Sequence, residues 1–225
     1  MKRFDLHVHS HYSFDSLNRP SDLVEKYSKL GFAGFAITDH GSMKATKTAQ
    51  QYAKEKNIPV EVIDACEFMT DKGEVIGLYL QEMINEKEFG PLCDAIHDQG
   101  GYAILPHPFD FHRKSACNPS LLPPELLRLV DGVETLNART IDKQSNADAL
   151  KWADDHSIIK TAGADAHLLF ECGTAYVETT DSISLEMALR KKQTIPCGKT
   201  SPVYVHLFST FAKLTRKFGI LKMPE

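Results

Sequence analysis

At 225 residues the chain has the length of one large domain, and its 42% hydrophobic and 25% charged residues are ordinary for a soluble globular protein. Its net charge of −4 argues against a general affinity for nucleic acid, although a local basic patch is compatible with it. No stretch is long and apolar enough for a signal peptide or a membrane span, and the five cysteines are scattered without a metal-site or redox spacing. These features indicate a single cytoplasmic domain with free thiols rather than a disulfide scaffold.

Short β-branched runs alternate with longer helical segments along the chain. The predicted strands are 3–8, 33–38, 60–66, 74–80, 102–106, 132–136, 158–163 and 174–178. The predicted helices are 21–30, 43–56, 86–99, 121–130, 142–156 and 183–192. A further amphipathic helix, at about 207–222, is expected to cover the bottom or the edge of the fold.

Alternating strands and helices indicate parallel strands with crossover helices, in either an α/β barrel or a doubly wound sheet. No glycine-rich phosphate loop follows the first strand, which weakens a nucleotide-binding doubly wound fold. Polar residues instead follow nearly every predicted strand, and in a barrel those strand ends converge on one mouth. We therefore predict one α/β barrel domain over 1–225, with the motif-bearing part at about 4–200.

Histidines and carboxylates are the polar residues that end these strands. His7 and His9 share a face because successive side chains of a strand alternate, so both can hold one ion. A bridging carboxylate such as Glu67 can place a second ion about 3.5–4 Å away, the usual spacing in two-metal hydrolysis. Nitrogen and carboxylate ligands without cysteine suit Zn, Mn or Fe, and such ions make hydroxide available near neutral pH. The residue types therefore indicate hydrolysis of a phosphoester or of an amide.

Six segments in order carry a resemblance to a known family: "DLHVHSHYSFD", "ITDHGS", "ACE", "AILPHPFD", "GVETLN" and "GADAH". They resemble the motifs of the PHP family (polymerase and histidinol phosphatase) from residue 4 to about 200. The resemblance implies a distorted (β/α)7 TIM-like barrel with two or three metal ions. Members of the family include histidinol phosphatases, nucleotide phosphoesterases, exonucleases and domains of bacterial DNA polymerases.

The resemblance also implies which residues bind the metals. The first metal would be bound by His7, His9, Glu67 and Asp165. The second would be bound by Asp15, His40 and His167, and His107 stands where the family has a further ligand, often for a third metal shared with Glu67. Many members have another histidine in a segment that here reads "EVIGLYL", where Ile76 and Gly77 cannot replace an imidazole. We therefore expect two tightly bound divalent ions (Zn, Mn or Fe) and a third that is weak or absent.

Four further residues are predicted to act on the substrate or to support the ligands. Arg113 and Arg139 directly follow barrel-mouth motifs, and guanidinium groups suit phosphate oxygens; the alternative for each is a solvated loop charge. Asp39 precedes His40 and should point to the other face of its strand, which favours orienting a ligand over coordination. The candidates for the general acid are Asp39, His112 and a metal-bound water.

Three more residues lie near the motifs but are not predicted as metal ligands. Glu134 and Asn137 could support the site, although Asn137 could equally cap the helix that begins near residue 142. His11 shares the parity of His7 and His9, but the chain should leave the strand there, which favours a solvated loop residue.

The leading hypothesis is a hydrolase: a metal-dependent phosphoesterase that acts on a small phosphorylated substrate, either a phosphomonoester or a nucleotide-type molecule. In this hypothesis a metal-bridged hydroxide attacks phosphorus, and the arginines stabilise the developing charge. One alternative is an exonuclease that uses the same ions on short nucleic acids. Another is a non-catalytic regulatory module of the same fold, which should have lost ligands. No membrane partner is expected, and the substrate, the physiological metal and the oligomeric state are left open.

Overall fold

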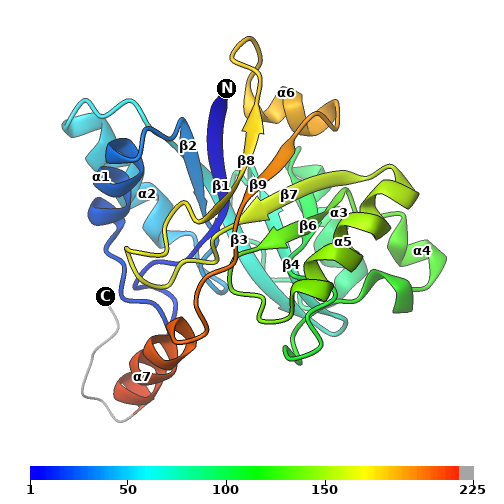
Figure 1. Cartoon of the computed structure of the whole chain (residues 1–225). Coiled ribbons are helices and arrows are strands. Elements are labelled where there is room, and N and C mark those ends of the chain that lie inside the picture. Colours follow the sequence, from blue (N-terminus) through cyan, green and yellow to red (C-terminus); the bar gives the residue numbers. More distant parts are fainter. Residues whose placement is uncertain (218–225) are drawn as a thin grey trace.

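One sheet of nine strands organises residues 1–217, the part of the chain that the computed structural model describes (Figure 1). The strand order is β7-β6-β5-β4-β3-β2-β1-β8-β9. The strands are β1 (Lys2–Val8), β2 (Gly34–Ile37), β3 (Glu61–Thr70), β4 (Gly73–Leu78), β5 (Tyr102–Leu105), β6 (Gly132–Asn137), β7 (Ile159–Gly163), β8 (Ala175–Thr179) and β9 (Ile195–Gly198). The helices are α1 (Pro20–Lys29), α2 (Lys44–Glu55), α3 (Phe89–Asp98), α4 (Pro124–Leu127), α5 (Lys143–His156), α6 (Leu185–Arg190) and α7 (Val205–Lys217), with a 3₁₀ turn at Pro119–Leu121.

The sheet curls until β1 lies beside the chain that leaves β7. The backbone N–H of Asp165 donates to the carbonyl of His7 at 2.7 Å, and that of His9 donates to the carbonyl of Ala166 at 3.0 Å. Strands β1 to β7 thus form a nearly closed barrel, while β8 continues the sheet from the first half of β1. The predicted distorted α/β barrel, in a single domain, is confirmed.

Strand β4 departs from the parallel order that the alternation predicts. It runs antiparallel to both β3 and β5, and only Asp71 and Lys72 separate it from β3. A parallel connection would need a crossover of a dozen or more residues, so a hairpin is the only connection this spacing allows. The first residues of β4, not the last, therefore lie at the mouth of the barrel. The expectation of parallel strands throughout was wrong here, and β8 is likewise antiparallel to β1.

Two other elements differ from the sequence-based expectation. Strand β9 was not predicted; it carries Pro196, which cannot donate to a strand ladder, and it lies at the edge of the sheet, where a proline is tolerated. The helix predicted at 121–130 is reduced to the single turn α4. Pro123 precedes this turn in an extended conformation and Pro124 begins it, so the helix cannot start earlier.

Helix α7 lies at the mouth of the barrel, where Figure 1 shows it beside the loop that follows β1. The Arg216 guanidinium donates to the carbonyls of Ser13 and, at 2.8 Å, Ser16 in that loop. The Arg139 guanidinium donates to Ser209 of the helix at 2.7 Å. The expected position at the bottom or edge of the barrel was wrong, because these contacts fasten the helix to the loops of the mouth. Residues 218–222 of the predicted helix lie outside the described residues.

The barrel interior below the mouth is apolar. It is filled by side chains such as Leu6, Ile63, Ile76 and Ile104, which belong to one buried cluster. Two further buried clusters join the outside of the sheet to α1 and α2 and to α3 and α5. The polar side chains of the mouth therefore lie between this apolar floor and the opening.

All five cysteines are free, and only Cys197 is partly exposed. Among residues 1–217 no helix has both the length and the apolar character that a membrane span requires.

Candidate metal centre

The structure brings together, at the mouth of the barrel, all eight side chains predicted as metal ligands. They are His7, His9, Asp15, His40, Glu67, His107, Asp165 and His167. Glu67, in the second half of β3, lies at the centre of the group. Its Oε1 is 3.6 Å from Nε2 of both His7 and His107. Its Oε2 is 3.5 Å from Nε2 of His9 and 3.0 Å from Nδ1 of His40.

Asp165 contacts both His7 and His9. Its Oδ1 lies 3.3 Å from Nε2 of His9 and 3.7 Å from Nε2 of His7. The two Nε2 atoms are themselves 3.1 Å apart. Two imidazole nitrogens and a carboxylate oxygen thus converge on one point, as the ligands of a single ion do.

A second convergence lies around Asp15, in the loop after β1. Its Oδ1 is 3.3 Å from Nε2 of His167 and 3.7 Å from Nε2 of His40. Ligand nitrogens of His9, His40 and His167 all lie within 4.8 Å of one another. His40 and His167 thus lie beside Asp15, next to the group formed around His7 and His9, and His9 contacts both groups.

A β-bulge in β1 aims His7 at the mouth. Between Asp5 and Val8 the strand has one residue more than the facing segment of β2, and such an insertion re-aims a side chain. Gly163 of β7 permits the close approach, because a Cβ at this position would lie 2.3 Å from Cβ of His7. His107 and Asp165 both have a positive φ, of 32° and 52°, which is costly for residues other than glycine.

Three of the histidines are held by their Nδ1 atoms, which leaves Nε2 free to face the cluster. Nδ1 of His7 lies 3.2 Å from Glu134, and Nδ1 of His167 lies 2.7 Å from the backbone carbonyl of Asp165. Nδ1 of His9 lies 3.1 Å from the hydroxyl of Ser13. These partners favour the ring proton on Nδ1, which leaves Nε2 unprotonated and able to bind a metal ion.

Ser13 and Asn137 form hydrogen bonds with carboxylates at the mouth. The Ser13 hydroxyl donates to Asp39 at 2.7 Å, so it accepts the proton of His9. The Asn137 amide donates to Glu134 at 2.9 Å and to Asp165 at 3.3 Å, which agrees with a supporting role rather than a helix cap. The cap of α5 is Asp142.

Replacing Ser13 by alanine should weaken metal binding by about 10- to 100-fold, the usual effect of removing a hydrogen-bond partner of a ligand. The ring of His9 then loses the contact that fixes its tautomer. Competition with a fluorescent chelator measures the change, and Ser120→Ala, at an exposed position, is the matched control. Equal affinities in the two variants would contradict the role assigned to Ser13.

Several buried atoms at the mouth have no hydrogen-bond partner within residues 1–217. They are Oδ1 of Asp15, Oε1 of Glu67, both ring nitrogens of His107, and Oδ1 of Asp165. A buried polar atom without a partner is costly, and folded proteins rarely contain so many in one place. All of them are good donors for a divalent cation. The residues present therefore fit the metal ions that the resemblance implies.

The charges of the cluster also suit cations. Burial alone would raise the pKa values of Glu67 and Asp165, but His7 and His40 beside Glu67, and Arg113 beside Asp165, hold both well below their usual range. Burial, followed by the charge of His167, lowers the pKa of His9 to about 3. The two carboxylates are thus ionised and the His9 ring is neutral, the forms in which both bind metals.

The four other predicted functional residues have different surroundings. Arg113 lies at the cluster, with its guanidinium 2.7 Å from Oδ2 of Asp165. Asp39 is buried behind the ligands, where it accepts hydrogen bonds from the backbone N–H of Ser10 and from two serine hydroxyls. Arg139 is not brought to the cluster: it is 3% exposed and lies against Glu171. His112 is exposed, with its ring against Phe111.

Sequence reasoning missed Glu74. It is buried at the start of β4, and a ligand atom of Glu74 lies within 4.8 Å of ligand atoms of His40 and Glu67. Burial, followed by the charge of Glu67, raises its pKa. Glu74 does not follow a strand but begins one, because β4 is reversed, so a rule about the carboxyl ends of strands does not find it. The signal was the short interval between Glu67 and Glu74, which has no room for a crossover helix.

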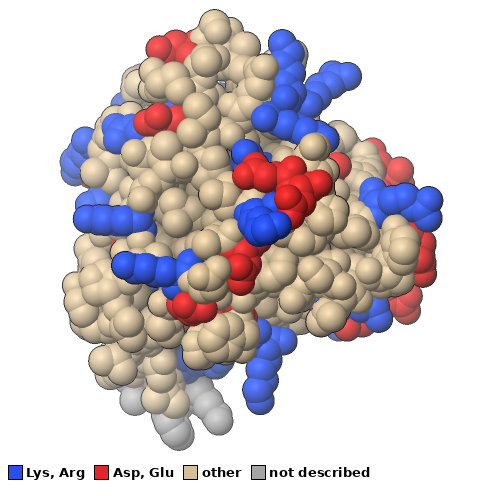
Figure 2. Space-filling model, turned by 45° about the vertical axis from the view of Figure 1, so that its right-hand side comes forward, with Lys and Arg blue, Asp and Glu red and all other residues tan. Residues whose placement is uncertain are grey.

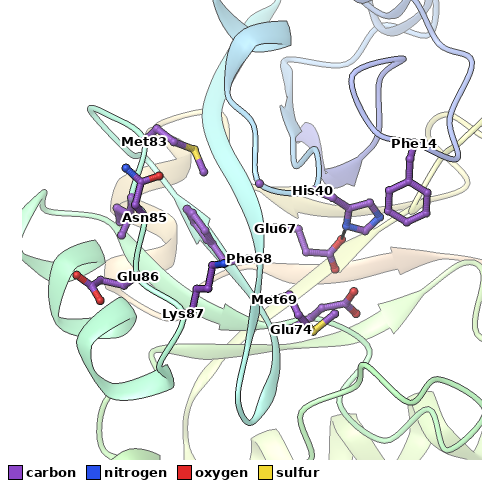
Figure 3. Close-up of a pocket in the computed structure, with 12 residues that line it drawn as sticks. Phe14, His40, Glu67, Phe68, Met69, Glu74, Met83, Asn85, Glu86 and Lys87 are labelled. Carbon is purple, nitrogen blue, oxygen red and sulfur yellow. Dashed lines mark ion pairs between the residues drawn. The ribbon is translucent and has the colours of Figure 1, made fainter. Parts of the chain in front are cut away.

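A cavity of about 480 Å³ adjoins the cluster (Figure 3). His40, Glu67 and Glu74 form its polar wall, and Phe14 stacks on the His40 ring with the centroids 5.0 Å apart. The rest of the wall is made by Gly41, Phe68, Met69, Met83, Ile84, Asn85, Glu86 and Lys87. A cavity of this volume accommodates a small organic molecule.

Known proteins are similar to the chain in sequence. The profile described as PHP domain matches residues 5–182. An uncharacterised protein of Methanocaldococcus jannaschii is 35% identical over 182 residues, an alignment that covers 80% of this chain and 71% of that protein. A PolC-type DNA polymerase III of Clostridium perfringens is 43% identical over 60 residues, which are 26% of this chain and 4% of the polymerase.

A solved structure is similar in fold. It is a two-domain protein of Bacteroides vulgatus that contains a predicted PHP-like metal-dependent phosphoesterase, and it aligns with a TM-score of 0.71 and 17% identity. The alignment covers 88% of this chain and 65% of that protein, so the chain spans just under two thirds of its length. At this identity the similarity shows the fold alone.

Proposed function

Because the chain belongs to the PHP domain family, we propose that it is a metal-dependent phosphoesterase that hydrolyses a small phosphorylated substrate. The observation that carries the proposal is the cluster at the barrel mouth, where imidazole nitrogens and ionised carboxylates converge and several buried metal-binding atoms have no hydrogen-bond partner among residues 1–217. Bound divalent ions would neutralise the oxygens of a phosphate group and provide hydroxide near neutral pH.

The protein's own residues would hold the ions and position the phosphate. Glu67 contacts ligands on both sides of the cluster, so it is the residue suited to bridge two ions. Glu134 and Ser13 keep the rings of His7 and His9 in the orientation that presents Nε2. The partly exposed guanidinium of Arg113 donates to Asp110 and Asp165, and its remaining N–H groups can bind phosphate oxygens and stabilise the charge that develops on them.

Replacing Arg113 by glutamine should lower kcat/KM for a phosphomonoester by about 10- to 1000-fold, because one charged donor to a transition state is worth up to about 4 kcal/mol. Arg113 also donates to the predicted ligand Asp165, so metal content is brought to that of the wild type with excess metal before turnover is compared. Steady-state kinetics and elemental analysis of one sample measure both quantities. Lys114→Gln, at the next and exposed position, should leave both unchanged. An equal loss of kcat/KM in the two variants would show that Arg113 does not act on the substrate.

The cavity and the surface charge support a small substrate over a nucleic acid. The cavity beside His40 holds about 480 Å³, and pockets for small molecules start at roughly 300 Å³. Figure 2 shows that lysine and arginine side chains on the face drawn are scattered among acidic ones. A channel for nucleic acid should instead show basic groups gathered along one groove.

A substrate screen with metal analysis tests the proposal. Full-length protein is stripped with a chelator, reloaded with Zn²⁺, Mn²⁺ or Fe²⁺, and given phosphomonoesters, phosphodiesters, oligonucleotides and amides. We expect chelator-sensitive release of phosphate from small monoesters, with oligonucleotides poorer substrates. Faster turnover of oligonucleotides would favour the exonuclease alternative. A metal-loaded protein without turnover of any phosphoester would contradict the proposal and favour the non-catalytic module.

A further inference from the structure

Three buried polar groups face one another on the β4 side of the cluster without forming hydrogen bonds. Nε2 of His107 lies 3.6 Å from Oε1 of Glu67 and 3.7 Å from Oε2 of Glu74. The side chains of His107, Glu67 and Glu74 are only 0%, 2% and 8% exposed. Both ring nitrogens of His107 and Oε1 of Glu67 have no hydrogen-bond partner in the described part of the chain. Figure 3 shows the carboxylates of Glu67 and Glu74 directed toward the same part of the cavity wall.

The separation between the His107 ring and each of the two carboxylates matches that of two ligands of one metal ion. Distances of 3.6 and 3.7 Å exceed those of ordinary hydrogen bonds, which end at about 3.2 Å for N–H···O. A water that bridged two of the atoms would hold them about 4.5 Å apart, given hydrogen bonds of about 2.8 Å. Two ligands of one tetrahedral ion, each at about 2.1 Å, lie about 3.4 Å apart. The observed separations are closest to the last of these.

We infer that Glu74 is a metal ligand, which completes a further divalent-cation site with Glu67 and His107. The sequence alone offered no ligand for such an ion on the strand after Glu67, because Ile76 and Gly77 cannot replace an imidazole; in the structure Ile76 lies in the apolar interior. Glu74 is two residues earlier, so it shares the inward face of β4, and the reversed direction of this strand places it at the mouth. The two carboxylates reach the ion position from neighbouring strands of the hairpin.

The donor set determines the character of this ion. Two carboxylates and one imidazole suit Mn²⁺ better than a histidine-rich group would. Three protein ligands leave coordination positions open, as catalytic sites do, and Glu67 and Glu74 also line the cavity beside the cluster. The ion would therefore face the bound substrate and exchange more readily than ions enclosed by His7, His9 and Asp165.

Titration with Mn²⁺ tests the inference. Chelator-stripped full-length protein is titrated, and free Mn²⁺ is followed by electron paramagnetic resonance. At a concentration that saturates the weakest step of the wild type, Glu74→Gln and His107→Gln should each bind about one ion fewer per chain. The double variant should lose no more than either single variant, because both residues serve one ion. Glu86→Gln, which removes a charge from the exposed rim of the same cavity, should bind as the wild type does.

Unchanged number and affinity of Mn²⁺ in Glu74→Gln would overturn the inference. In the remaining explanation Glu74 is only an ion-pair partner of His107. Thermal unfolding in the presence of chelator distinguishes this explanation from metal binding by Glu74. That explanation requires a lower melting temperature of the metal-free variant with an unchanged metal count. If Glu74→Gln does not fold, Glu74→Asp, which keeps the charge and shortens the side chain, replaces it in the titration and should bind the ion more weakly. The titration needs no substrate, so its outcome is independent of whether the phosphoesterase proposal holds.

Discussion

Replacing Glu67 by glutamine should lower the phosphoesterase activity on the order of a thousandfold or more. Its two oxygens face His7 and His107 on one side and His9 and His40 on the other. Within residues 1–217 no other carboxylate lies within 4 Å of as many of the predicted histidine ligands. Glutamine keeps the volume but removes the charge and one acceptor oxygen, which prevents bridging of two ions. Loss of metal-based charge stabilisation is worth several kcal/mol in the transition state, and about 1.4 kcal/mol corresponds to tenfold in rate.

Elemental analysis and kinetics of the same sample test this prediction. Glu67→Gln should hold fewer tightly bound ions than the wild type after gel filtration and should show no turnover above that of the metal-free protein. Glu61→Gln is the matched control, since Glu61 begins the same strand at the far end of the barrel and is exposed. Full metal content together with wild-type turnover in Glu67→Gln would show that the reaction does not use this cluster.

The sequence predicts the site well where each ligand follows from local rules. Alternation along β1 places His7 and His9 on one face, and the positions of polar residues at strand ends locate His40, Glu67 and His107 around one mouth. The barrel itself follows from the same pattern. Each of these inferences needs only the order of the strands and the direction of their side chains.

Inference from the sequence fails where the backbone breaks the regular pattern. The bulge between Asp5 and Val8 leaves no trace in the composition of β1. The reversal of β4 hid Glu74, because a rule about the ends of strands does not apply to an antiparallel strand. Arg139 directly follows a mouth motif, yet it binds α7, and the contact depends on a helix 66 residues further along the chain. Such contacts arise from tertiary packing alone.

Asp5 has the second large expected effect, on stability rather than on chemistry. Its buried carboxylate accepts four hydrogen bonds, from the backbone N–H groups of His7, Ala164 and Gly173 and from the hydroxyl of Tyr27, at 2.6 to 3.3 Å. These donors lie up to 168 residues away and tie β1 to the chain that leaves β7. Removing the carboxylate leaves several buried donors unpaired, each at a cost of about 1–3 kcal/mol.

Asp5→Ala should therefore lower the free energy of unfolding by about 3–5 kcal/mol, a large part of the stability of an ordinary domain. Asp5→Asn should also be destabilised, because its NH₂ group would face N–H or O–H donors instead of accepting from them. Urea denaturation of the chelator-stripped proteins measures both. Tyr27→Phe removes a single hydrogen bond and keeps the ring against Phe35, so it should cost only about 1 kcal/mol.

The same variants connect the fold to the metal centre. Asp5 contacts the backbone of His7 and of Ala164, the residue before Asp165, so it positions two ligands from behind the mouth. If Asp5→Asn folds, its metal affinity should fall together with its stability. Asp94→Asn, on the exposed side of α3, should change stability by less than about 0.5 kcal/mol and leave metal binding unaltered. A stable Asp5→Asn protein with wild-type metal affinity would contradict this account, since the four hydrogen bonds of Asp5 would then contribute neither to closing the barrel nor to aligning its ligands.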